Sequence, residues 1–165
     1  MAKSILSFFL SIVTTLMSFT ATLNTNKAPD YKTDFVPVLR FEVMSDTHVK
    51  AIGDSHSSRL QKAVSFAYDY ASKSDSYKNL DAVVIAGDLT NNGTLDQFTG
   101  FAATVKSVVK NDTSFLAVVA KSHDGYTHDR KSLEIYSDLT GNDADYHRVI
   151  NGYHFIGISS SKNKG

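Results

Sequence analysis

Residues 41–48 have the sequence FEVMSDTH, a short apolar run that ends in an aspartate and a histidine. Residues 82–88, AVVIAGD, repeat the arrangement with a longer run that ends in Asp88. Strands buried in a parallel sheet are short apolar runs, and ligands in such folds gather beyond the carboxyl ends of the strands. The two stretches therefore predict an α/β fold with ligand-type side chains at one edge of its sheet.

A third apolar run, residues 114–120, leads into Lys121, Ser122, His123 and Asp124. Three predicted strands thus deliver five ligand-type side chains to adjoining loops: Asp46, His48, Asp88, His123 and Asp124. The chain has no cysteine. Its ligands are therefore carboxylate oxygens and imidazole nitrogens, which suit Mn, Fe, Zn or Mg rather than soft metals.

In these blocks the chain resembles the calcineurin-like metallophosphoesterases. Their pattern is Asp-x-His, then Gly-Asp with a further Gly, then Gly-Asn-His before Asp or Glu, each after a strand. Residues 46–48 (DTH) match the first block, and residues 87–93 (GDLTNNG) match the second. The third block, residues 121–123 (KSH), keeps the histidine and has serine in place of asparagine. The resemblance extends over roughly residues 38 to 159.

The resemblance implies a metal-dependent hydrolase of phosphate esters with two divalent ions, Mn, Fe or Zn. By this resemblance Asp88 bridges the two ions, while Asp46 and His48 hold the first. Ser122 occupies the position of a ligand of the second ion, and His123 is catalytic, as a proton donor to the leaving group or a phosphate-orienting group. A serine hydroxyl is a feeble ligand, so the second ion is expected to bind weakly.

The family completes its site with a lone histidine and a Gly-His-x-His block. Between the third block and Gly165 the only histidines are His128, His147 and His154, and none of them lies in such a motif. We therefore expect residues 38–165 to form a partial phosphoesterase domain, truncated at its C-terminus and impaired in activity. The alternative is a non-catalytic remnant that acts as a metal-binding or interaction module and self-associates through an exposed sheet edge.

The first 23 residues predict export. A lysine at position 3 precedes an apolar stretch from Ile5 to Phe19, which is typical of a signal peptide or a membrane anchor. Residues 24–37 are polar, contain Pro29 and Pro37, and are expected to form a linker. The predicted location is thus secreted or membrane-anchored, outside the cytoplasm.

The rest of the chain alternates between helical and strand patterns. Helices are expected over residues 57–72, 95–109 and 128–139. Asn151 and Gly152 separate two strand-like runs, residues 145–150 and 153–159, and predict a hairpin whose strands can present His147 and His154 at the surface. The sequence thus predicts a layered α/β domain, and the resemblance implies sheets flanked by helices in four layers.

Charge excludes one class of partner. The chain has seventeen basic and seventeen acidic side chains and no net charge. A protein that binds nucleic acid through its phosphates is expected to have a basic surplus or stripe. The expected partner is a phosphate-ester substrate and not a nucleic acid.

Overall fold

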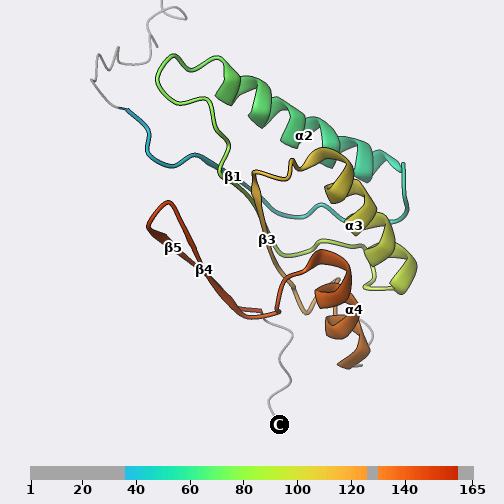
Figure 1. Cartoon of the computed structure of the whole chain (residues 1–165). Coiled ribbons are helices and arrows are strands. Elements are labelled where there is room, and N and C mark those ends of the chain that lie inside the picture. Colours follow the sequence, from blue (N-terminus) through green and yellow to red (C-terminus); the bar gives the residue numbers. More distant parts are fainter. Residues whose placement is uncertain (1–35, 126–129, 160–165) are drawn as a thin grey trace, which may run out of the picture. The chain divides into compact units, whose positions relative to one another are not determined.

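The computed structural model describes residues 36–125 and 130–159, without the side chains of residues 130–133. The predicted export segment, most of the predicted linker and His128 lie outside these residues. In chain order the elements are β1 (Phe41–Met44), α2 (Ser55–Ser72), β2 (Ala82–Ala86), α3 (Leu95–Val108), β3 (Ser114–Val118), α4 (Arg130–Thr140), β4 (Tyr146–Ile150) and β5 (Tyr153–Gly157) (Figure 1). None of the helices in these ranges is long and apolar enough to cross a membrane.

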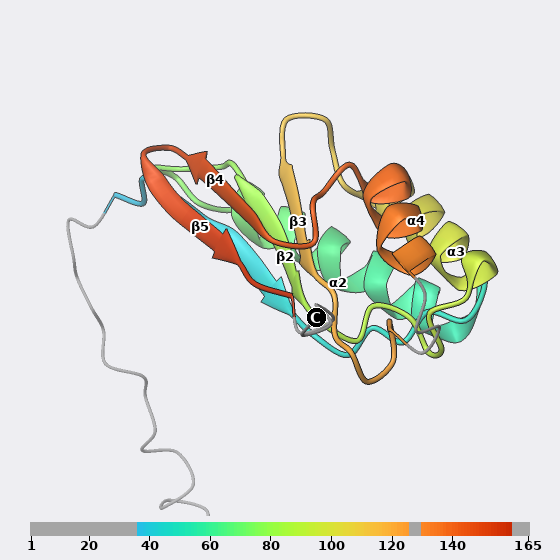
Figure 2. The same cartoon turned by 90° about the horizontal axis from the view of Figure 1, so that it is seen from below.

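The first three strands form a parallel sheet in the order β1-β2-β3. Each neighbouring pair is connected through a helix, and such crossovers are right-handed in nearly all proteins. Since the strand order advances in one direction, both crossover helices must lie on the same face. Figures 1 and 2 show α2 and α3 on that face, with α4 beside α3 and the β4–β5 hairpin across the opposite face.

The core lies between the sheet and its helices. The strand register places Val83, Ile85 and Ala117 on the helix side, and all three are fully buried. From α3, Phe98 and Phe101 are fully buried as well. Tyr136 of α4 adds a fully buried ring whose hydroxyl donates to the Ala117 carbonyl at 2.8 Å.

The helices begin at capping residues. The Asp54 carboxylate accepts from the Ser57 N–H at 2.6 Å, so α2 starts at Ser55 rather than at the predicted residue 57. The apolar pattern of this helix becomes visible only at Leu60, and the cap sets the true start. The α3 helix is capped by Thr94 and covers the predicted range except for its last residue.

The predicted hairpin is confirmed. Asn151 and Gly152 have φ of 50° and 82°, as its tight turn requires, and β4 pairs antiparallel with β5. The Asn151 amide donates to the Val38 carbonyl at 3.2 Å and to the Asp81 carboxylate at 3.0 Å. Phe155 meets Phe41 of β1 edge-on, with 5.2 Å between ring centroids. The turn and one face of the hairpin therefore anchor it to the parallel sheet.

The predicted α/β class is thus confirmed as a parallel three-stranded sheet flanked by helices, with a small second sheet.

Glu42 is an acidic residue on the face of the sheet that packs against the helices. Register aligns it with Val83 and Phe115. Its Oε2 atom is buried without a hydrogen-bond partner among the described residues, and burial raises the pKa of the Glu42 carboxyl. Because the folded-state pKa is raised, this carboxyl contributes to stability at low pH, where it is protonated. That contribution is lost as the pH rises through the folded-state pKa.

We therefore expect Glu42→Gln to raise the melting temperature at pH 7, because the variant does not bury a charge. The gain should shrink toward pH 4, where the wild-type carboxyl is largely protonated in the folded protein. Thermal unfolding at both pH values measures this, with Glu134→Gln on the exposed surface of α4 as the matched control. A gain of the same size at both pH values would show that the charge of Glu42 is not the cause.

Candidate metal centre

Three of the predicted site residues have left-handed backbone conformations. The φ angles of Asp46, His48 and Asp88 are 58°, 45° and 50°. Side-chain-bearing residues seldom adopt this region, and such strained positions gather at functional sites. Apart from Asn151 in the hairpin turn, no other non-glycine residue among those described has a positive φ. The strain is therefore concentrated where β1 and β2 deliver their polar side chains.

The loops after β1 and β2 remain aligned beyond the sheet. The Asp46 N–H donates to the Gly87 carbonyl at 3.2 Å, and the His48 N–H donates to the Asp88 carbonyl at 3.0 Å. Val49 and Thr90 form a further parallel bridge. These contacts hold Asp46 and His48 in register with Asp88, although the backbone there has left the extended conformation.

The Asp124 carboxylate connects the loop after β3 to the loop after β2 through hydrogen bonds. One oxygen accepts from the Thr90 N–H at 2.8 Å and from the Thr90 hydroxyl at 3.0 Å. The other accepts from the N–H groups of Leu89 at 3.1 Å and Ala120 at 3.0 Å. Asp124 is fully buried, and burial raises the pKa of its carboxyl while the donors to it act in the opposite direction.

The loops after β2 and β3 also approach each other closely at Gly93. A Cβ on Gly93, which has φ of 66°, would lie 2.4 Å from the Asp124 carbonyl oxygen. Only glycine leaves room for the backbone of residues 123 and 124 here. The consequence is that His123, next to Asp124 in the chain, is fixed against the loop that carries Asp88.

His48, Asp88 and His123 form a group that can hold a metal ion. Each offers one ligand atom, and these atoms all lie within 4.8 Å of one another. The imidazole rings of His48 and His123 meet edge-on with centroids 4.5 Å apart. The His48 Nε2 atom lies 4.0 Å from an Asp88 oxygen, and both side chains are partly shielded from solvent. Two imidazoles and one carboxylate are a ligand set suited to a borderline divalent ion.

The tautomer of His123 follows from its partner. Its Nδ1 atom lies 2.7 Å from the Asn91 carbonyl oxygen, which can only accept a hydrogen bond. Nδ1 must therefore carry the proton, and in the neutral ring Nε2 keeps its lone pair. A carbonyl that fixes the ring in this way is a common support for a metal-binding histidine.

Asp46 and Ser122 lie at the margins of this group. Asp46 is 64% exposed, and one of its oxygens is 3.8 Å from the His48 Nε2 atom. The hydroxyl of Ser45 donates to its other oxygen. Ser122 donates its hydroxyl to Asp88 at 2.7 Å, so it orients that carboxylate. The ligand roles of both residues stay predictions, as does the catalytic role of His123.

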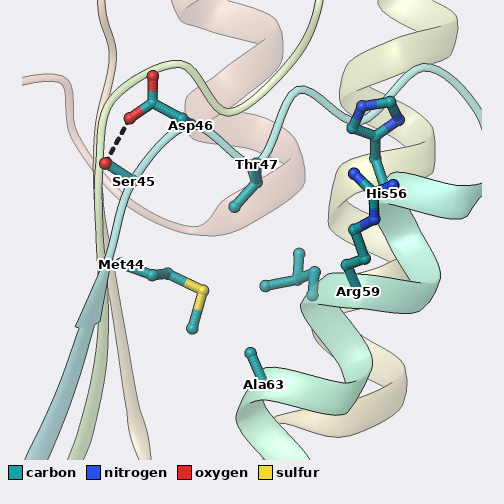
Figure 3. A pocket seen from close by; sticks show the side chains of 8 residues that line it. Met44, Ser45, Asp46, Thr47, His56, Arg59 and Ala63 are labelled. Atoms are coloured by element: carbon teal, nitrogen blue, oxygen red, sulfur yellow. Dashed lines mark hydrogen bonds between the residues drawn. The ribbon is translucent and has the colours of Figure 1, made fainter.

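A pocket of about 210 Å³ opens beside Asp46 (Figure 3). Residues 44–47 line one side, and α2 lines the other with His56, Arg59, Leu60 and Ala63. Arg59 is exposed and forms no hydrogen bond or ion pair within the described residues. Nothing in the sequence distinguishes Arg59 or predicts the structural role of Asp124. An arginine on the surface of a helix follows no special pattern. An aspartate after a strand can equally be a metal ligand or a structural residue.

No model of a known protein family matches the chain, and a search among curated proteins finds no match. The inference about function therefore rests on the geometry of the site and on the motifs in the sequence.

We expect Asp124→Asn to destabilise the protein by about 2–4 kcal/mol, because an amide NH₂ would face two donors in place of an accepting oxygen. Mn²⁺ binding should weaken as well, since His123 loses its fixed position. Urea unfolding and calorimetric titration measure the two effects, and Asp112→Asn on an exposed loop is the control. Wild-type stability in Asp124→Asn would show that the four contacts do not hold the loops together.

Proposed function

We propose that this protein is a metal-dependent hydrolase of phosphate esters of the calcineurin-like type. The observation that carries the proposal is the convergence of His48, Asp88 and His123 from three separate strand ends. The sequence motifs contain the same three residues: the resemblance makes His48 and Asp88 metal ligands, together with Asp46 and Ser122, and gives His123 a catalytic role. The motifs and the geometry thus agree on His48 and Asp88 as ligands, and the geometry adds His123 as a further possible ligand.

The group has the chemistry that the reaction needs. His48, Asp88 and His123 would hold a divalent ion, which would supply Lewis-acid polarisation of a phosphate ester and activation of water near neutral pH. The side chain of Asp88 supplies negative charge to the site, and Ser122 orients it. His48 and His123 supply imidazole nitrogens, and the carbonyl of Asn91 fixes the His123 ring.

The pocket beside Asp46 suits an anionic substrate. The guanidinium of Arg59 stands across the pocket from Ser45 and Asp46, next to His56 (Figure 3). Arginine binds phosphate oxygens through paired N–H groups and stays charged at all physiological pH values. We propose that Arg59 orients the substrate phosphate, which leaves the strand-end residues to hold the ion.

The specific four-layer fold of the family, the second ion and the export of the protein are parts of the same proposal. Among the described residues, His48, Asp88 and His123 would be available to one ion, with Asp46 at the margin, whereas a second ion would meet only Asp88 and Ser122. Turnover is therefore expected to be slow, because the second ion's share of charge stabilisation is weak, and such contributions are worth about 10²–10³ in rate.

Hydrolysis of p-nitrophenyl phosphate and of its bis-ester, with added Mn²⁺, tests the proposal. Wild type should show slow, chelator-sensitive turnover, and Asp88→Asn should lose at least about 10²-fold of it together with most Mn²⁺ binding. Arg59→Met should mainly raise KM. Asp112→Asn is the control. Equal metal-dependent rates in wild type and Asp88→Asn would contradict the assignment of the site.

A second candidate function, an interaction module that self-associates, is favoured by one observation. Strand β1 lies at an edge of the sheet, and among the described residues no strand pairs with its outer side. Its side chains Phe41 and Val43 are 47% and 58% exposed. An unprotected apolar edge of this kind pairs readily with a second copy of the same chain.

If the edge pairs, the protein should form dimers or larger assemblies at rising concentration, and Val43→Lys should return it to the monomer, because an edge lysine opposes pairing. Light scattering coupled to gel filtration measures the mass. Ile52→Lys replaces an exposed apolar side chain away from the edge, 68% exposed against 58% for Val43, and serves as the control. A monomeric wild type at all concentrations would exclude this function.

A further inference from the structure

The two histidines of the β4–β5 hairpin lie on its outward face. Register pairs His147 with Ile156 and Val149 with His154, so the histidines are diagonal neighbours on adjacent strands. Side chains alternate between the two faces of a strand. Since Phe155 points toward Phe41 of the parallel sheet, His154 points the other way.

The two imidazoles are in direct contact. The Nε2 atom of His147 lies 2.9 Å from the Nδ1 atom of His154. The rings are stacked, with 4.9 Å between centroids and 28° between planes. Both residues are exposed. A hydrogen bond between two imidazoles uses a proton on one nitrogen and a lone pair on the other, so the two facing nitrogens share one proton.

We infer that His147 and His154 form a second metal site, a two-histidine chelate for Cu²⁺ or Ni²⁺. Metal–imidazole bonds are about 2.0–2.1 Å long. Two such nitrogens at a right angle around an ion lie about 2.9 Å apart, and at a tetrahedral angle they lie about 3.3–3.4 Å apart. The observed separation of 2.9 Å is that of a hydrogen bond, and it is close enough for small side-chain rotations to reach either spacing. Imidazole nitrogens bind Cu²⁺ and Ni²⁺ well, and among the divalent first-row ions the affinity of a given nitrogen site is highest for Cu²⁺.

The hairpin holds both ligands in place before an ion arrives. Each histidine is on a strand that is paired along its full length, so only side-chain rotations are needed to turn both lone pairs toward one ion. The rest of this face is apolar, with Val149 and Ile156 being 55% and 71% exposed. Ligands that are fixed at a short separation act as a chelate, because the second binds at a high effective concentration.

This site is independent of the candidate metal centre. It uses neither of that centre's imidazoles and no carboxylate, and it lies on the hairpin rather than on the loops after β1, β2 and β3. The inference therefore does not depend on the proposed phosphoesterase function. It also concerns residues whose substitution leaves the core untouched, since both side chains are exposed.

The test is calorimetric titration of the untagged full-length chain with Ni²⁺ and with Cu²⁺. Wild type should show a binding event that His147→Gln and His154→Gln each weaken by about 10²-fold, and that Asp112→Asn on an exposed loop leaves unchanged. His56→Gln removes a histidine outside the pair and should also leave it unchanged. Zn²⁺ should bind here more weakly than Cu²⁺.

Electron paramagnetic resonance of the Cu²⁺ form gives a readout that folding defects do not imitate. Two coupled nitrogens for each ion bound at the hairpin are expected in wild type and in Asp112→Asn, and one or none at this site in each hairpin variant. Circular dichroism should show the same fold for all of them. Unchanged Ni²⁺ and Cu²⁺ affinity in the His147→Gln, His154→Gln double variant would overturn the inference.

Discussion

The site depends above all on one buried carboxylate. Asp124 accepts four hydrogen bonds, from Leu89, Ala120 and both donors of Thr90, and these groups belong to two different loops. A carboxylate without partners would be costly at this depth, so the four contacts offset the cost of burying Asp124. They align the loop after β2 with the loop after β3. His123 can reach Asp88 and His48 only because that alignment exists.

The second constraint is the backbone strain at the ends of β1 and β2. Three ligand-type residues, Asp46, His48 and Asp88, have positive φ angles, at a cost of order 1–3 kcal/mol each. The hydrogen bonds from Asp46 and His48 to the loop of Asp88 hold this conformation. A turn without a chemical task can use glycine at such positions without strain. Two of the three strained residues, His48 and Asp88, instead belong to the group that can hold a metal ion, and the third, Asp46, lies beside it.

The sequence predicted the parts of the structure that local pattern controls. Apolar runs identified β1, β2 and β3, and Asn151–Gly152 identified the hairpin turn. The polar residues at the strand ends identified His48, Asp88 and His123, because parallel strands bring their carboxyl ends to one edge. The contacts between loops could not be predicted from the sequence, because no local pattern of residues marks them. Whether Asp124 is a ligand or a buried tie depends on which N–H groups surround it, and that is decided by tertiary packing.

The two faces of the β4–β5 hairpin differ: one packs on the parallel sheet, and the other presents two histidines to solvent. The turn amide of Asn151 and the ring of Phe155 fix it to the parallel sheet. His147 and His154 lie on the other face, so an ion bound there would brace β4 against β5 without disturbing those anchors. The two groups of ligands also differ in kind. A carboxylate with two imidazoles at the strand ends can hold a borderline divalent ion, whereas the proposed pair of exposed imidazoles on the hairpin would suit Cu²⁺ or Ni²⁺. If both sites bind ions as proposed, the protein would discriminate between metals by placing different donor sets on separate elements of one small domain.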